Sequence, residues 1–228
     1  MVDEVSKNSA QKFQVPYKLS DVKSCNFNDA GGIFFHKFEP SFKLEKPAVK
    51  KTSTQELYDS WNNVTGNLSQ DFFDGIVKIS KNIKCNPEDL AALMYHESKF
   101  DPKTQSSDKR FHGLIQFDER SLKAAVKNAY DKNLNIPNLD KDINIEKLNT
   151  LSREEQLPYV EAYLSLAKDY CGLKNKKLTG GELWGMIKSP RQTKAKNTAF
   201  LNNVQNQLDS IKTIPLKYEI PFYLKKQD

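Results

Sequence analysis

Hydrophobic side chains recur at helical spacing through most of the chain that follows residue 54. The clearest run consists of Phe72, Phe73, Ile76, Ile79 and Ile83. Ser69 precedes this run and is the expected N-cap of the helix. A second predicted helix begins at Asn86-Pro87, because asparagine caps helix N-termini and proline is favoured at the first helical position.

Two capping boxes predict further helices downstream. Ser152 with Glu155, and Thr179 with Glu182, each place a hydroxyl and a glutamate three residues apart, and an apolar face follows each pair. Residues 131–150 instead predict a loop, and prolines 215 and 221 punctuate an extended segment near the C-terminal end. Strand alternation is absent before that segment, so the pattern predicts a mainly α fold.

The chain divides into three predicted parts. Residues 1–52 combine prolines, a glycine pair and clustered aromatics with poor periodicity, which predicts an extended or partly disordered N-terminal arm. Residues 53–190 carry the helical pattern and form the predicted domain. Residues 191–228 are expected to form a C-terminal helix and an irregular, extended tail.

The charge balance bears on possible partners. The net charge is +6, but only four of the 35 basic residues are arginine, at positions 110, 120, 153 and 191. Arginine supplies most bidentate contacts to bases and phosphate, so no nucleic-acid partner is expected. A diffuse lysine excess suits attraction to an acidic cell wall.

Several other functional classes are disfavoured. No apolar run is long enough to span a membrane, and Met1 to Lys12 lack the apolar core of a secretory signal, so the delivery route is left open. The three cysteines and three histidines are scattered. They form no metal-ligand spacing, so neither a metal nor a cofactor is expected.

One glutamate falls on the apolar face of its predicted helix. Leu90, Leu93 and Met94 form the stripe of the helix that opens at Pro87, and Glu97 occupies its next position. Burial disfavours the charged form of a carboxyl group, so the pKa of Glu97 is expected to be raised. Such a group keeps a proton near neutral pH and can donate it to a glycosidic oxygen.

A glycine-led apolar turn follows that helix. Residues 111–117 read Phe-His-Gly-Leu-Ile-Gln-Phe, in which Gly113 lets the backbone approach another chain or a ligand closely. Gln116 carries an amide that could bind the hydroxyl or N-acetyl groups of a sugar.

Together, Leu93-Met-Tyr-His-Glu-Ser-Lys-Phe-Asp-Pro102 and Gly113-Leu-Ile-Gln-Phe117 resemble the lytic transglycosylases with a lysozyme-like fold. The helix Glu154-Glu-Gln-Leu-Pro-Tyr-Val-Glu-Ala-Tyr-Leu164 is most similar to that of phage-type members. The resemblance spans residues 70–190. It implies a lysozyme-like domain that acts on peptidoglycan glycan strands, in the periplasm, at the cell surface or in a virion.

The resemblance also implies roles for individual residues. Glu97 would be the general acid and base, Ser98 would orient it by a hydrogen bond, and Gln116 would line the glycan cleft. Many members carry an Ala-Tyr-Asn-Ala-Gly motif whose tyrosine supports the catalytic glutamate. This chain lacks that motif, and Tyr163 is the candidate substitute. His112 stands where members tend to have a small residue.

The implied reaction cleaves the β-1,4 bond between N-acetylmuramic acid and N-acetylglucosamine, and the muramoyl C6 hydroxyl closes a 1,6-anhydro ring. A monomer is expected. One alternative is a lysozyme-type hydrolase of the same fold, which needs a second carboxylate; Asp108, Asp118 and Glu119 are interpreted as solvated loop charges. The other is a non-catalytic wall-binding or phage structural protein.

Overall fold

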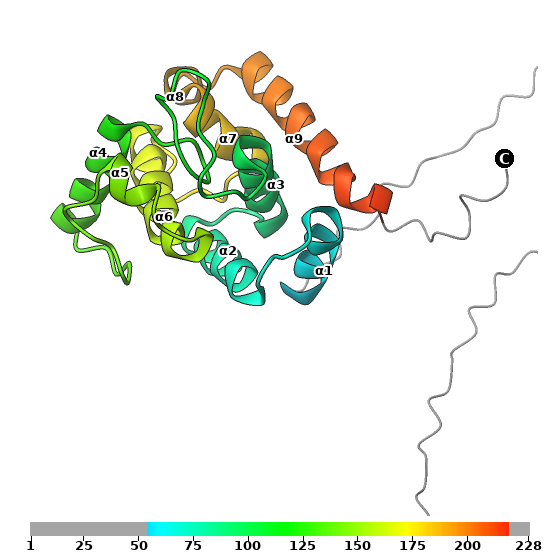
Figure 1. Ribbon diagram of the computed structural model, residues 1–228. Helices are drawn as coiled ribbons and strands as arrows, with labels where there is room; N and C mark the ends of the chain where they lie inside the picture. Colours follow the sequence, from blue (N-terminus) through cyan, green and yellow to red (C-terminus); the bar gives the residue numbers. More distant parts are fainter. Residues whose placement is uncertain (1–53, 219–228) are drawn as a thin grey trace, which may run out of the picture. The chain divides into compact units, whose positions relative to one another are not determined.

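The computed structural model describes residues 54–218 (Figure 1). The predicted N-terminal arm, and the tail beyond Tyr218 with Pro221, lie outside the described residues. The described residues form the helices α1 (Thr54–Thr65), α2 (Gln70–Ile83), α3 (Pro87–Ser98), α4 (Glu119–Asp131), α5 (Ile145–Leu148), α6 (Arg153–Tyr170), α7 (Gly180–Lys188), α8 (Pro190–Lys194) and α9 (Thr198–Tyr218). Within this part of the chain the regular secondary structure is helical, and two isolated bridges pair His112 with Gln105 and with Phe117.

The predicted helix starts are confirmed. Ser69 and Asn86 cap α2 and α3 by accepting hydrogen bonds from Phe72 N and Glu88 N. The boxes that open α6 and α7 both form, with reciprocal hydrogen bonds between the capping hydroxyl residue and the glutamate. These caps were predictable because each depends on residues only three positions apart.

Three elements differ from the sequence-based prediction. Helix α5, capped by Asn144, lies within residues 131–150, which were predicted to be a loop. Asp118 and Glu119 do not lie in a loop: Asp118 caps α4 and Glu119 is its first residue. The buried residues of α4, Leu122, Ala125, Val126 and Ala129, recur at helical spacing behind that cap, so the sequence did carry the signal for this helix. The chain around Pro215 is not extended, because α9 continues through that proline to Tyr218.

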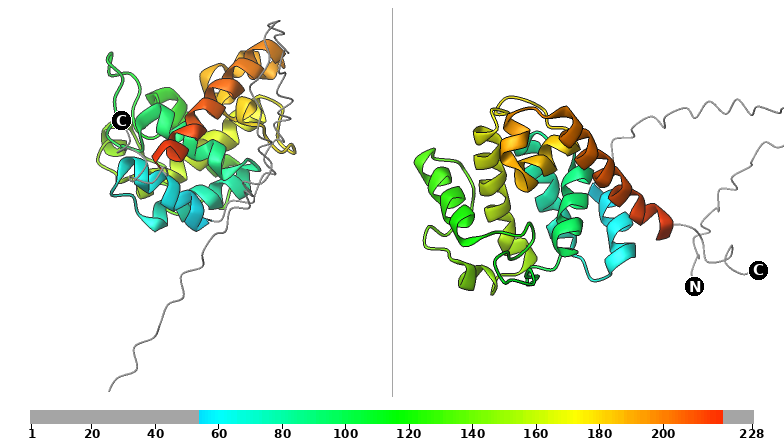
Figure 2. Two further views of the ribbon diagram at one scale, coloured as in Figure 1. Left: turned by 90° about the vertical axis from the view of Figure 1, so that its right-hand side faces the viewer. Right: turned by 90° about the horizontal axis from the view of Figure 1, so that it is seen from above.

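Helix α3 lies in the interior of the described part. It packs against α2, α7 and α9, and Leu90, Leu93 and Met94 are fully buried. Figures 1 and 2 show α9 lying along one side of α3. Lys212 on α9 reinforces this contact, since its Nζ lies 2.7 Å from Oδ1 of Asp89. The helix that carries Glu97 is therefore held on several sides.

No helix among residues 54–218 combines the length and apolar character needed to cross a membrane.

Candidate active site

Glu97 lies in the last turn of α3, where the apolar stripe of that helix ends. Its side chain is half-buried, as the helical phase predicted. Directly after Ser98, Lys99 and Phe100 both adopt left-handed backbone angles, with φ of 56° and 62°. Such angles are costly for residues with a side chain, and they end the helix abruptly.

A cluster of aromatic rings fixes this unusual helix end. Phe100 is 1% exposed, and its ring packs edge-on against those of Trp61, Phe72 and Phe73, with centroids 5.4 to 6.0 Å apart. Burial of the ring offsets the backbone strain, because a large aromatic side chain gains several kilocalories per mole, about 3–5 by truncation data. Glu97 is thus held on a rigid helix terminus.

Trp184 is the hydrogen-bond partner of Glu97. Its Nε1 donates to Oε1 of Glu97 across 2.9 Å, from helix α7, although the two residues are 87 positions apart. The indole is 1% exposed, so its N–H has no access to bulk water and needs an internal acceptor. The imidazole of His96 packs on the indole of Trp184, with the two ring centroids 4.4 Å apart. Nζ of Lys188 lies 4.8 Å from the centroid of the same indole.

The pKa of Glu97 is raised above that of an ordinary glutamate. Burial against α7 is the largest cause, because it disfavours the ionised form. The Trp184 hydrogen bond and the positive charges of Lys188 and Lys99 act in the opposite direction and are outweighed. The raised pKa matches the prediction from the apolar stripe.

A tight turn faces the end of α3. His112 and Phe117 exchange two backbone hydrogen bonds, and Gly113 and Gln116 adopt left-handed angles between them. Ser98 donates to the backbone oxygens of Met94 and Leu114, both 3.1 Å away. The hydroxyl of Ser98 therefore links α3 to this turn by a hydrogen bond, in place of the expected direct hydrogen bond to Glu97.

Gln156 on α6 anchors the turn from the other side. The side chain is fully buried and accepts a hydrogen bond from Leu114 N at 3.1 Å. Its amide nitrogen donates to the backbone oxygens of Pro102 and Leu148. One side chain thereby connects α6 to two loop segments and to the end of α5, and through Leu114 and Ser98 to the helix end that carries Glu97.

Replacing Gly113 with alanine is expected to lower the free energy of unfolding by about 2–4 kcal/mol, measured in urea. A Cβ atom there would lie 2.5 Å from Oε1 of Gln156, whose hydrogen bonds prevent it from moving aside. Gly66→Ala is the matched control, since Gly66 has a similar φ of 62° but no atom within 4 Å of its added Cβ. The control should lose only about 1 kcal/mol of its free energy of unfolding. Equal losses in the two variants would mean that the Gln156 side chain moves aside for the added methyl group.

The amide of Gln116 is only partly engaged. Its nitrogen donates to the backbone oxygens of Gly113 and Thr104, at 3.0 and 3.3 Å, while its oxygen has no hydrogen-bond partner within residues 54–218. The side chain is half-buried. The amide oxygen is therefore available to accept a hydrogen bond from a ligand.

Tyr163 lies near Glu97, but it is not the hydrogen-bond partner that the sequence suggested. Its ring packs edge-on against Phe117, with centroids 5.8 Å apart. Burial raises the pKa of Tyr163 to about 12, and the charges of Asp118 and Glu97 add to the shift. The hydroxyl therefore stays neutral at physiological pH.

A cavity of about 590 Å³ opens beside Tyr163. Three helices line most of it: α4, α6 and α8. We call it the α4–α6–α8 cavity. It is lined by Asp118, Arg120, Ser121, Ala124, Tyr163, Leu166, Ala167, Tyr170, Lys188, Ser189, Pro190 and Arg191. Lys188, which contacts the indole of Trp184, connects the cavity to the surroundings of Glu97.

The three carboxylates considered as a second catalytic group are all engaged elsewhere. Asp108 is fully exposed, and hydrogen bonds from Ser106 and from the backbone of Arg110 lower its pKa. Glu119 is held by Lys123 and the backbone of Ile145, which also lower its pKa. Asp118 accepts a hydrogen bond from Ser121 N at 2.8 Å as the cap of α4.

Residues 54–218 contain no group of three histidine, cysteine or acidic side chains placed to hold a metal ion.

A helical domain in which one half-buried glutamate ends an interior helix, opposite a buried glycine turn, is lysozyme-like. Residues 75–162 match the family model described as the Transglycosylase SLT domain. The chain therefore contains an SLT-type lytic transglycosylase domain, of the class that acts on peptidoglycan in the cell wall. The match includes Glu97 and the turn after Gly113, and it ends before Trp184. The comparisons with curated proteins and with solved structures gave no match.

Proposed function

We propose that this protein is a peptidoglycan lytic transglycosylase that cleaves the β-1,4 bond between N-acetylmuramic acid and N-acetylglucosamine. Glu97 is its general acid and base, and the products carry 1,6-anhydromuramoyl ends. The observation that carries the proposal is the half-buried Glu97 with its raised pKa, located within the segment that matches the transglycosylase family. The similarity of the sequence to phage-type members does not distinguish between the possible reactions.

The reaction begins with proton transfer from Glu97. The carboxyl proton moves to the bridging oxygen, the bond from that oxygen to muramoyl C1 breaks, and positive charge develops at C1 and the ring oxygen. The Trp184 N–H stabilises the carboxylate that forms, because it donates to one of the two oxygens that share the new charge. The carboxylate in turn stabilises the sugar cation.

The C6 hydroxyl of the same muramoyl unit then attacks C1, and ionised Glu97 takes up its proton. Attack within one sugar gives the nucleophile a large effective concentration, so neither water nor a second carboxylate is required. The engagement of Asp108, Asp118 and Glu119 in other contacts supports this route over hydrolysis.

The remaining predicted site residues have separate proposed roles. The free amide oxygen of Gln116 accepts a hydrogen bond from a sugar hydroxyl or N-acetyl group. Tyr163, which lines the α4–α6–α8 cavity on the side of Glu97, contacts the muramoyl unit that is cut. Ser98 is a positioning residue, since it acts on Glu97 through the turn at Leu114.

Digestion of purified cell wall is expected to yield glycan fragments with 1,6-anhydromuramoyl ends, each one water lighter than a reducing end. Mass spectrometry of the released fragments measures the ratio of the two. Mainly reducing ends would assign the protein to the lysozyme-type hydrolases, and the absence of any cleavage would favour a wall-binding or phage structural role.

A further inference from the structure

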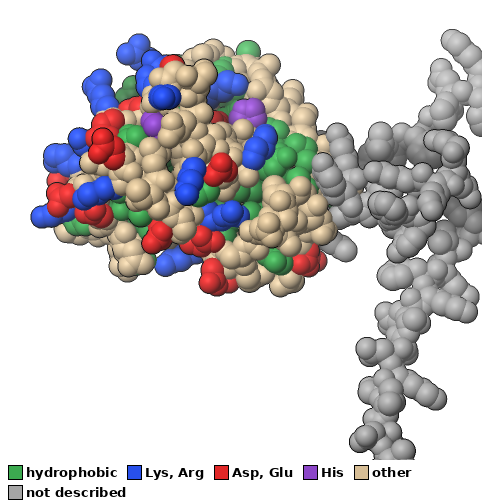
Figure 3. All heavy atoms as spheres, viewed as in Figure 1, with side chains coloured by type: hydrophobic (Ala, Val, Ile, Leu, Met, Phe, Trp, Pro, Cys, Tyr) green, Lys and Arg blue, Asp and Glu red, His purple; other side chains and the backbone are tan. Residues whose placement is uncertain are grey.

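The α4–α6–α8 cavity is basic on its rim. Three cationic side chains, Arg120, Lys188 and Arg191, line it together with one carboxylate, Asp118. Asp118 is occupied as the cap of α4. By contrast, the cavity lined by Asp140, Lys147, Glu154 and Glu155 is acidic. On the face that Figure 3 shows, basic and acidic side chains are interspersed. The cavity near Asp142 has the same balance of three cations to one carboxylate, but its cations are all lysines, whereas two of the three in the α4–α6–α8 cavity are arginines.

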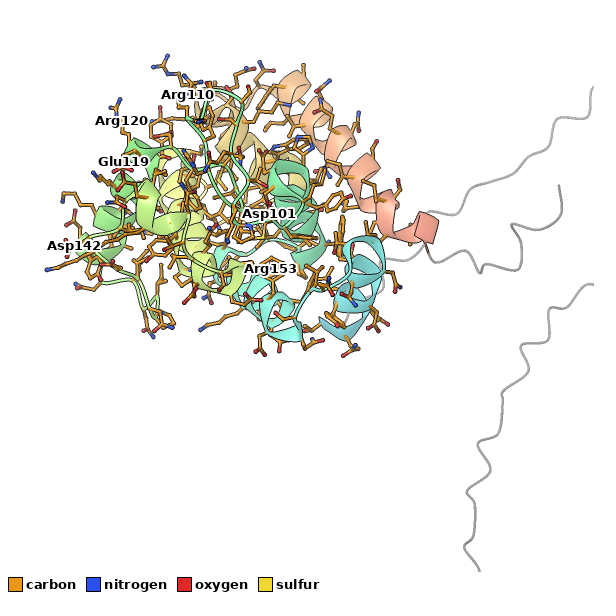
Figure 4. All side chains as sticks on the ribbon, viewed as in Figure 1. Asp101, Arg110, Glu119, Arg120, Asp142 and Arg153 are labelled. Atoms are coloured by element: carbon orange, nitrogen blue, oxygen red, sulfur yellow. The ribbon has the colours of Figure 1, made fainter. Side chains whose placement is uncertain are left out.

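The arginines of the described chain fall into two groups. Arg110 pairs with Asp108, and Arg153 donates to the backbone oxygen of Asn67. Within residues 54–218, the guanidinium groups of Arg120 and Arg191 make neither a hydrogen bond nor an ion pair, and both line this cavity. Figure 4 shows Arg120 well separated from Arg153. Two free guanidinium groups on one cavity form a site for a carboxylate or phosphate.

Part of the cavity lining is apolar. Leu166, Ala167 and Tyr170 on α6 contribute to it, and Tyr170 is 47% exposed. Nζ of Lys194 lies 4.6 Å from the centre of the Tyr170 ring and adds positive charge at the edge. The cavity therefore fits a ligand that combines small apolar groups with an anionic end, and its volume lies within the ordinary range of about 300–1,000 Å³ for ligand sites.

We propose that the α4–α6–α8 cavity binds the peptide stem of the muramoyl unit at which the glycan is cut, with Arg120 and Arg191 holding a stem carboxylate. This inference rests on the proposed function. The stem carries methyl groups and free carboxylates, and it branches from the same sugar whose C1 lies at Glu97. Lys188 lines the cavity and contacts the indole of Trp184, which in turn donates a hydrogen bond to Glu97, so a single contact chain connects the two sites.

Reaction chemistry favours the stem over the other anionic substituents of a cell wall. Ring closure uses the C6 hydroxyl of the cleaved unit, so that unit cannot carry a phosphodiester on the same oxygen. The lactyl group of that unit takes no part in ring closure, so the peptide stem that extends from it can carry negative charge. The substrate is therefore predicted to be peptide-bearing glycan, in preference to strands without stems.

The test compares two substrates prepared from one wall freed of teichoic acid: strands with stems, and strands from which an amidase has removed them. The full chain and its R120A/R191A variant are assayed on both. We expect the variant to raise KM on stem-bearing strands by roughly tenfold or more. Its kcat/KM on stripped strands should stay within about twofold of wild type, because exposed groups away from the cut bond contribute little there.

The matched control is K127A/K141A, which removes two positive charges from a different cavity, near Asp142. Asp142 is separate from Arg120 in Figure 4. This variant should change KM little, and equally on both substrates, since it alters only the diffuse attraction to the wall. Thermal melting establishes that both variants are folded. Equal losses on both substrates in R120A/R191A, or no loss on either, would overturn the proposal.

A binding measurement separates this inference from the proposed reaction. Calorimetry on the E97Q variant uses N-acetylmuramoyl peptide with a free C-terminal carboxylate, and the same compound as its carboxamide. We expect the carboxylate to bind roughly tenfold more tightly, and the difference to vanish in E97Q/R120A/R191A. Equal binding of the two compounds would contradict the site even in an active enzyme, whereas failure of wall cleavage alone would contradict only the reaction.

Discussion

Replacing Glu97 with glutamine is expected to reduce cleavage of cell-wall glycan by roughly 10²- to 10⁴-fold, measured as the release of soluble fragments. Glutamine keeps the shape of the side chain and can still accept the hydrogen bond from Trp184, but it has no proton to donate at neutral pH. Glu146→Gln is the control, because Glu146 is an exposed glutamate on α5 and should leave activity unchanged. A fully active E97Q would remove Glu97 from the mechanism.

The same substitution should leave the protein at least as stable near neutral pH. Burial raises the pKa of folded Glu97 above its unfolded value. The stability associated with this group is therefore complete below the unfolded pKa and is lost as the pH rises through the folded pKa. Glutamine has no charge to bury, so the variant avoids that loss. Thermal melting as a function of pH measures the difference, which should grow from acidic toward neutral pH.

Replacing Trp184 with phenylalanine is expected to lower kcat by about 10- to 100-fold, because a hydrogen bond to a charged group is lost. The pH profile provides a second readout. The Trp184 N–H lowers the pKa of Glu97, so its removal raises that pKa further. Activity requires the protonated acid, and its decline on the alkaline side should therefore move to higher pH.

The matched control is Trp61→Phe, at the chain's other tryptophan. Trp61 is also buried, but its ring packs against Tyr95 and Phe100, not against Glu97. Both substitutions leave a similar void, so both should lower the melting temperature. Only Trp184→Phe should shift the alkaline decline of the pH–activity profile to higher pH. An unchanged alkaline decline in that variant would mean that the indole acts through packing alone.

The sequence by itself determined the features that depend on neighbouring residues. Helix starts at Ser69, Asn86, Ser152 and Thr179 followed from capping groups within three positions of the helix. The direction of the Glu97 pKa shift followed from its place on the apolar stripe of α3, next after the fully buried Leu90, Leu93 and Met94. The family resemblance depended on two short motifs, and the family match confirms it.

Helices α4 and α9 differ from the sequence-based interpretation for different reasons. In α4 the local signal was present, because Leu122, Ala125, Val126 and Ala129 recur at helical spacing behind the Asp118 cap, and the interpretation of Asp118 and Glu119 as loop charges overlooked it. In α9, Pro215 costs a backbone hydrogen bond, but the helix continues because Leu208 and Lys212 already bind it to the domain. Packing against other elements therefore outweighs the local preference only in α9.

Only the tertiary structure decided which groups surround Glu97. No spacing rule connects it to Trp184, 87 positions later, and the one signal was an unexplained tryptophan behind the capping box of α7. The partners of Ser98, the anchoring of the turn by Gln156 and the pairing state of each arginine likewise depend on residues distant in sequence. The reason is physical. A pattern fixes which way a side chain faces along its own helix, but the identity of what it faces depends on how separate helices pack.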